Sequence, residues 1–166
     1  MTVIDMNGCE IDDLWREGET NASLQAGPII LGSQAIAGIT REALGAARPI
    51  GLRISPDALK EPLVNLLDLI DLIVIDFSSF RDGRGFTAAT TLRQRHGFTG
   101  ELRAAGDILP DQFVALRECG FTTIKTPVNH PPELWRRQLT ASSQGGQLLH
   151  RLLGGRNRPI VHLQSR

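Results

Sequence analysis

The chain has few cysteines. Its 166 residues include only Cys9 and Cys119, which lie far apart and form no Cys-x-x-Cys pair. A disulfide framework and a four-ligand zinc site are therefore not expected. Two distant cysteines also cannot bind an iron–sulfur cluster, which needs four ligands. We expect no metal site and no resident cofactor.

Long apolar runs are also absent. The most apolar stretch, residues 63–77, is interrupted by one asparagine and three aspartates, so it is too polar to span a bilayer. The first eight residues contain no basic segment followed by an apolar one, so no secretory signal is expected. These absences predict a cytoplasmic protein with no membrane partner.

Neither sign of charge is in excess, because 18 basic and 18 acidic side chains cancel. Without a net positive field, and with only two tryptophans to stack on bases, the chain is not expected to bind nucleic acid. The charges are unevenly placed, since residues 1–20 contain six acids and one arginine, whereas residues 134–166 contain six arginines and no acid. The basic end is either a solvated tail or a segment that docks onto an acidic partner.

The order of apolar runs and turn residues predicts an α/β fold. Five short apolar segments read as strands, at residues 28–32, 50–54, 72–77, 101–105 and 121–125. Stretches of helical composition separate them, at residues 33–47, 55–70, 86–96 and 110–119, and Pro131-Pro132 opens a last helical region. Such alternation implies a parallel sheet. About five units are too few for a closed eight-fold barrel, so we expect an open or half-barrel layered sheet.

The N-terminal segment differs from this pattern. Asn7-Gly8 lies between short apolar runs and predicts a β-hairpin with a type I′ turn within residues 1–15. Residues 16–28 are polar and predict a linking loop. We expect residues 1–155 to form a single α/β domain and residues 156–166 a loose tail.

The candidate catalytic residues follow from this fold. Ligands of parallel α/β proteins bind beyond the carboxyl ends of the strands. Asp76, Asp107 and Lys125 are expected there. They could act as acid or base, hold a metal or bind an anion. Alternatively, the two aspartates only cap the loops and helices that follow.

The segment 81–88, Arg-Asp-Gly-Arg-Gly-Phe-Thr-Ala, is the most unusual. Gly83 and Gly85 allow backbone N–H groups to converge on an anion. Arg81 and Arg84, with Arg103 as a further clamp, could then bind it through charge-assisted hydrogen bonds. A tight turn that starts a helix explains the same residues. The glycines also fit a variant dinucleotide fingerprint, but they follow their strand too late, so a nicotinamide dinucleotide is a weaker alternative.

Four longer motifs carry a resemblance to a known family. They are Phe-Arg-Asp-Gly-Arg-Gly-Phe at 80–86, Leu-Arg-Gln-Arg-His-Gly-Phe at 92–98, Gly-Glu-Leu-Arg-Ala-Ala-Gly-Asp at 100–107 and Leu-Arg-Glu-Cys-Gly-Phe at 116–121. In these the chain resembles the DUF934-type bacterial family of unknown function, which is usually encoded beside sulfite reductase in sulfur-assimilation operons. The resemblance implies a role in sulfite reduction and cysteine biosynthesis, and members are commonly described as probable oxidoreductases. It implies no catalytic residue set.

Three functions remain open at this point. The first is a non-catalytic accessory of assimilatory sulfite reduction that binds the reductase, its electron donor or an oxyanion such as sulfite. The second is a small oxidoreductase, or a metal- or anion-dependent enzyme, that uses the strand-end residues. The third is a structural module without a ligand. Nothing in the sequence determines the oligomeric state.

Overall fold

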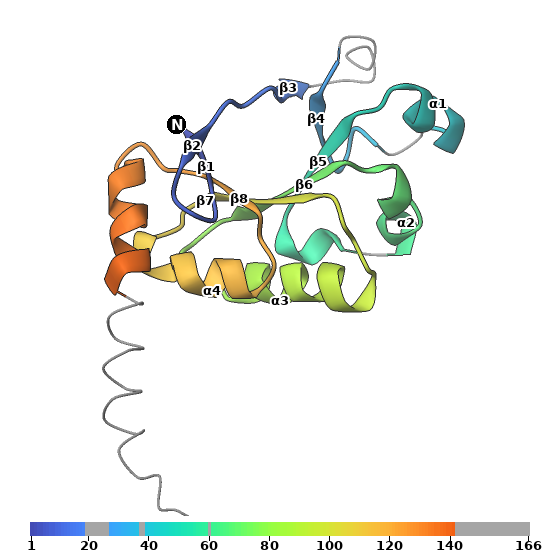
Figure 1. Cartoon of the computed structure of the whole chain (residues 1–166). Helices are drawn as coiled ribbons and strands as arrows, with labels where there is room; N and C mark the ends of the chain where they lie inside the picture. The colour runs from blue at the N-terminus through green and yellow to red at the C-terminus, as the bar shows by residue number, and fades with distance from the viewer. Residues whose placement is uncertain (19–26, 37–38, 60, 142–166) are drawn as a thin grey trace, which may run out of the picture.

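The computed structural model describes residues 1–18, 27–36, 39–59 and 61–141. This part of the chain forms a mostly parallel eight-stranded sheet in the order β2-β1-β8-β7-β6-β5-β4-β3. Figure 1 shows the sheet curled, with α3 and α4 packed along one side. The strands are β1 Val3–Asp5, β2 Glu10–Ile11, β3 Arg16–Gly18, β4 Ile29–Gly32, β5 Ile50–Ile54, β6 Leu72–Phe77, β7 Glu101–Gly106 and β8 Thr123–Lys125.

Short helices connect these strands. The α-helices are α1 Arg41–Ala46, α2 Glu61–Val64, α3 Arg84–Thr90 and α4 Phe113–Glu118. Three 3₁₀ turns, η2 Pro56–Ala58, η3 Leu67–Leu69 and η5 Pro110–Gln112, and one π-helix, η4 Thr91–Arg95, accompany them. Residues 132–141 are helical and follow Pro131, as predicted.

The five predicted core strands are confirmed as β4 to β8. Each pairs in parallel with the next one along the chain, so the predicted α/β half-barrel is the observed architecture. The predicted N-terminal hairpin is also present, and β1 joins it to the sheet by pairing antiparallel with β8.

The hairpin turn is not of type I′. Only Gly8 has a left-handed backbone, with φ of 76°, and its N–H donates to the Asp5 carbonyl at 3.0 Å. The Asp5 carboxylate also accepts from the N–H groups of Asn7 at 2.9 Å and Cys9 at 2.8 Å. The Asp5 N–H donates to the Cys9 carbonyl at 2.9 Å, so the loop has three residues, and a loop of this length needs only one left-handed residue.

Residues 16–28 are not all loop, as was predicted. Arg16–Gly18 forms β3, which pairs in parallel with β4 and lies at the sheet edge. The sequence did not predict β3, because its residues are charged, which is typical of an edge strand and not of a buried one.

A strap, residues 12–15, joins β2 at one edge of the sheet to β3 at the other. In a flat sheet, seven strand spacings of about 4.8 Å would separate these edges by roughly 34 Å. The five residue steps from Ile11 to Arg16 reach at most about 18 Å. The strap therefore requires the sheet to curl, and it crosses the concave side (Figure 1).

The two faces of the sheet have different environments. Ile73, Ile75 and Phe77 of β6 lie on the convex face and pack in the main core with the helices. Leu72 and Val74 lie on the concave face, where Trp15 of the strap covers them. Polar side chains share this concave face, so it is only partly apolar.

Two predicted helices are shorter than expected. In the described part of residues 33–47, only Arg41–Ala46 is α-helical, with the Thr40 hydroxyl accepting from the Ala43 N–H. The segment after β5 is divided into η2, α2 and η3. There the Asn65 carbonyl accepts from Arg41 at 2.8 Å instead of extending a helix.

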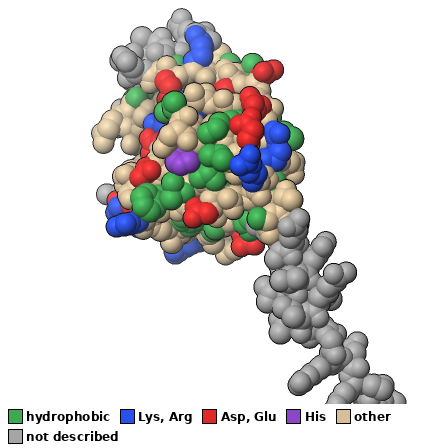
Figure 2. Space-filling view, turned by 90° about the vertical axis from the view of Figure 1, so that its left-hand side faces the viewer, with side chains coloured by type: hydrophobic (Ala, Val, Ile, Leu, Met, Phe, Trp, Pro, Cys, Tyr) green, Lys and Arg blue, Asp and Glu red, His purple; other side chains and the backbone are tan. Residues whose placement is uncertain are grey.

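Helix 132–141 packs against α4 and the hairpin. Trp135 is fully buried, contacts Phe113 edge to face at 5.9 Å and donates to the His130 carbonyl at 2.9 Å. Arg136 donates to the Gly8 carbonyl at 3.0 Å. Figure 2 views the molecule from this side and shows acidic, basic and apolar side chains interspersed. The predicted tail and the rest of the basic end lie outside the described residues.

Candidate functional site

A group of four charged side chains occupies the concave face near the carboxyl ends of the strands. We call it the concave cluster: Glu17 of β3, Arg53 of β5, Asp76 of β6 and Lys125 of β8. Arg53 Nη1 lies 2.7 Å from Asp76 Oδ1, and Arg53 Nη2 lies 2.5 Å from Glu17 Oε1. Lys125 Nζ lies 3.3 Å from the same Glu17 oxygen. The structure thus links two predicted residues, Asp76 and Lys125, through two others.

Strand alternation and sheet curvature together create this cluster. Arg53 is out of phase with Leu52 and Ile54, whose side chains enter the main core, so it must face the concave side. Two strands, β6 and β7, separate β5 from β8 in the sheet. Their side chains meet at one carboxylate because the sheet is curled.

The Glu17 carboxylate is held as an anion. Its partial burial acts to raise its pKa, but hydrogen bonding from Arg53 and the charges of Arg53 and Lys125 outweigh burial and lower the pKa below 4.5. The two cations are about one-quarter exposed, at 27% for Arg53 and 24% for Lys125. Solvent therefore reaches the cluster without screening it fully.

Arg103 lies deeper on the same face. Its side chain is 2% exposed, and its Nη1 donates to both carboxylate oxygens of Asp13 at 3.0 Å. Its Nη2 donates to Glu101 at 2.9 Å, and Thr123 donates to that same carboxylate at 2.6 Å. Arg103 points to the concave side and not into the helix layer, and two acids already neutralise it.

Asp107 lies apart from the concave cluster, on the loop after β7. Its side chain accepts from the Phe80 N–H at 3.3 Å, while Gln112 donates to the Phe80 carbonyl at 2.8 Å. These bonds hold the loop after β6 beside the loop after β7. The glycine segment is therefore at the carboxyl edge, as expected, but Asp107 has a positioning role there.

The arginines of the glycine segment have partners of their own. Arg84 contacts Asp82 at 2.5 Å and Asp57 at 2.6 Å. The hydrogen bonds from the Arg84 side chain and backbone lower the pKa of Asp82 to about 2. Arg81 lies over the Phe80 ring, 5.3 Å from its centroid. Two carboxylates thus already neutralise the Arg84 guanidinium, without any external anion.

The glycines of this segment serve packing more than backbone freedom. Gly83 has a φ of −72°, which any residue adopts, and a side chain there would meet nothing within 4 Å. A Cβ on Gly85 would lie 2.4 Å from the Phe77 ring. Gly85 therefore allows α3 to approach β6 closely.

Sequence reasoning missed Arg53, Glu17 and Asp13. Alternation along residues 50–54 could have placed Arg53 opposite the apolar face. Glu17 and Asp13 gave no such signal, because they belong to a short polar edge strand and to the strap. Their roles depend on contacts more than 30 residues away in sequence.

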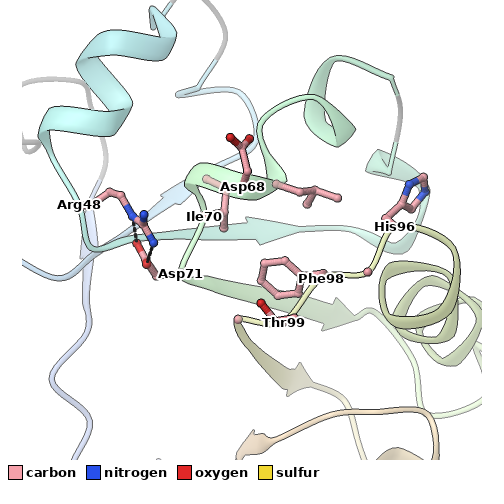
Figure 3. A pocket seen from close by; sticks show the side chains of 10 residues that line it. Arg48, Asp68, Ile70, Asp71, His96, Phe98 and Thr99 are labelled. Atoms are coloured by element: carbon pink, nitrogen blue, oxygen red, sulfur yellow. Dashed lines mark hydrogen bonds and ion pairs between the residues drawn. The ribbon is translucent and has the colours of Figure 1, made fainter.

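A hollow of about 560 Å³ lies at the opposite, amino edge of the sheet, between the segments that precede β5, β6 and β7. Figure 3 shows Arg48 reaching Asp71 on one side, with Phe98 and His96 on the other. Asp71 also accepts from the Ile50 N–H at 2.9 Å, so the Arg48–Asp71 pair fixes the start of β5. The volume suits a small molecule, but ligands of parallel sheets bind at the other edge.

Among the described residues, no group of three or more His, Cys, Asp or Glu side chains is arranged to hold a metal ion. None of the helices in that part has the length and apolarity to cross a membrane.

Residues 51–148 match the family model described as "Bacterial protein of unknown function (DUF934)". No curated protein matches the chain.

Proposed function

The chain belongs to the DUF934 family of bacterial proteins, and from this premise we propose that it is a non-catalytic accessory of assimilatory sulfite reduction. It would act in cysteine biosynthesis by binding sulfite reductase, the electron donor of that enzyme, or a small oxyanion such as sulfite. The link to sulfite reduction rests on the sequence resemblance given above.

One observation favours an accessory over an enzyme. Each predicted acid or base already has a partner: Asp76 is bound by Arg53, Lys125 by Glu17, and Asp107 by the Phe80 N–H. A general acid or base needs access to a substrate proton. Residues engaged in this way are better suited to hold a binding surface in shape.

The cysteines support the same view. Reduction of sulfite to sulfide takes six electrons and requires cofactors such as siroheme, iron–sulfur clusters or flavin. Cys9 is exposed on the hairpin and Cys119 ends α4, so the two cysteines of this chain belong to separate elements. This chain supplies no four-cysteine set for a cluster.

The hairpin edge offers a surface for a protein partner. Ile11 lies opposite Val3, and hydrogen bonds between Thr2 and Thr126 bring the first residues beside the segment after β8. Four exposed apolar side chains belong to the first residue, β2, the strap and the segment after β8: Met1 at 80%, Ile11 at 38%, Leu14 at 73% and Val128 at 79%. Exposed apolar groups rimmed by charge are typical of protein interaction sites.

Direct binding tests the proposal. Full-length protein would be mixed with purified sulfite reductase, and separately with its electron donor, at low salt and analysed by biolayer interferometry. We expect saturable binding to one of them, weakened at least tenfold by Leu14→Asp. Phe80→Asp is the control, because Phe80 is an exposed apolar residue at the carboxyl edge. Absence of binding to both would refute the partner role.

The second candidate is a small oxidoreductase, or a metal- or anion-dependent enzyme. It is favoured because Asp76 and Lys125 both belong to the concave cluster. In this case Lys125→Ala or Asp107→Ala would abolish growth on sulfate in a deletion strain while leaving a folded protein. Full complementation by both variants would eliminate this candidate.

A further inference from the structure

We propose that Arg53 and Lys125 form a binding site for a small oxyanion, and that the Glu17 carboxylate occupies this site in the absence of the anion. The inference rests on the oxyanion branch of the proposed function, and it moves that site from the glycine segment to the concave cluster. Sulfite, sulfate and phosphate are the relevant chemical class.

Two cations converge on one oxygen of the Glu17 carboxylate. Arg53 Nη2 and Lys125 Nζ lie 2.5 Å and 3.3 Å from Glu17 Oε1. Arg53 Nε also faces the second carboxylate oxygen, at 3.4 Å. The two oxygens of the Glu17 carboxylate, which share one carbon atom, thus contact the edge of a guanidinium and an ammonium group. Sulfite and phosphate present the same kind of O–X–O edge.

Both cations have a fixed place in the sheet. Arg53 and Lys125 belong to β5 and β8, and both lie near the carboxyl ends of their strands. Parallel α/β sheets bind ligands there. The convergence depends on the curled sheet and not on one flexible loop, so both cations are already held in position.

The Glu17 side chain is the most exposed of the four in the concave cluster. Glu17 comes from β3, a three-residue edge strand, and its side chain is 49% exposed. Arg53 keeps a separate contact with Asp76. If Glu17 swings into solvent, two cations and one carboxylate remain, which leaves one net positive charge to attract an anion.

An internal carboxylate competes with any external anion. A tethered group has an effective concentration in the millimolar range. We therefore expect weak binding to the natural chain and binding at least tenfold tighter to Glu17→Gln. Glu10→Gln removes the same charge from β2, which does not contact the cluster, and should bind as the natural chain does.

Nuclear magnetic resonance of the full chain would measure this binding. The two tryptophans give two indole N–H signals, and Trp15 lies two residues before Glu17. Titration of Glu17→Gln with sulfite, sulfate and phosphate should shift the Trp15 signal saturably. The Trp135 signal, whose N–H is bonded to the His130 carbonyl, should not move. A chloride titration at matched ionic strength controls for screening.

Two further variants locate the site. Adding Arg53→Gln or Lys125→Met to Glu17→Gln should abolish the shift, whereas adding Arg117→Gln on α4 should not. Equal affinity of Glu17→Gln, Glu10→Gln and the natural chain would overturn the proposal, as would saturable binding that survives loss of both cluster cations. If Glu17→Gln does not fold, the natural chain and Lys125→Met are compared at high anion concentration. Reductase binding is measured separately, so the partner role and this site can fail independently.

Discussion

Asp13 of the strap binds the buried guanidinium of Arg103, so the loss of stability on substituting Asp13 can be predicted. Asp13→Asn keeps the shape of the side chain but removes the charge that accepts two hydrogen bonds at 3.0 Å. Hydrogen bonds to charged groups contribute about 1.5–3 kcal/mol. Glu101 still binds Arg103, so we expect Asp13→Asn to lower the free energy of unfolding by about 2 kcal/mol.

Removal of both acids should cost more. In Asp13→Asn/Glu101→Gln the guanidinium, 2% exposed, has no carboxylate partner. Leaving a buried charge unpaired costs about 3–5 kcal/mol. The double variant should therefore lose about that amount. Because both acids are about one-quarter exposed, water can replace part of each lost contact, which favours the lower end of this range.

Urea unfolding at pH 7, followed by tryptophan fluorescence and circular dichroism, would measure these losses. In a chain of this size, about 2 kcal/mol corresponds to a fall in Tm of roughly 4–8 °C. Asp12→Asn is the matched control, because this exposed neighbour forms no ion pair in the described part of the chain and should change stability by less than about 0.5 kcal/mol. Equal stability of Asp13→Asn and Asp12→Asn would refute the strap contact.

Three further predictions concern packing and pH. Gly85→Ala should destabilise by about 1–3 kcal/mol because its Cβ would clash with Phe77, whereas Gly83→Ala should be neutral or slightly stabilising; chemical denaturation of the pair would show the difference, and equal effects would contradict it. Gly51→Val should displace Trp15, whose ring would lie 3.2 Å from the new Cβ, so the Trp15 fluorescence should shift to longer wavelength; an unchanged spectrum would argue against that packing. The pKa of Glu17 is lowered in the folded protein, so its ion pair contributes fully to the free energy of unfolding above pH 4.5, and this contribution is lost as pH falls through the folded pKa. The difference in the free energy of unfolding between the natural chain and Glu17→Gln should therefore shrink on acidification. A constant difference from pH 7 to pH 3 would be inconsistent with the ion pair.

The parallel core was predictable because its signal is local. Continuous apolar runs such as residues 72–77 are typical of strands buried on both faces, and turn residues between them mark the crossovers. The hairpin was predictable from Asn7-Gly8, although its turn type was not. That type depends on the loop length, which is three residues between Asp5 and Cys9 and not the two that type I′ requires.

The site was predictable only in part. The rule about carboxyl ends identified Asp76 and Lys125, but it could not identify Glu17, which lies 108 residues before Lys125. Nor could the sequence show that Arg84 is bound by Asp57, because that contact joins the start of α3, after β6, to η2, after β5. Pairing between distant charges depends on sheet curvature, which no local pattern encodes.

The family match begins at residue 51. Asp13 of the strap and Glu17 of β3, which bind arginines on the concave face, come before that residue. A fragment cut at that boundary would keep Arg53, Arg103 and Lys125 but lose these two counter-charges, along with four of the eight strands of the described sheet. The stretch that the family model matches is thus smaller than the part of the chain that contributes strands to this sheet. Expression of this protein for any assay should start at residue 1.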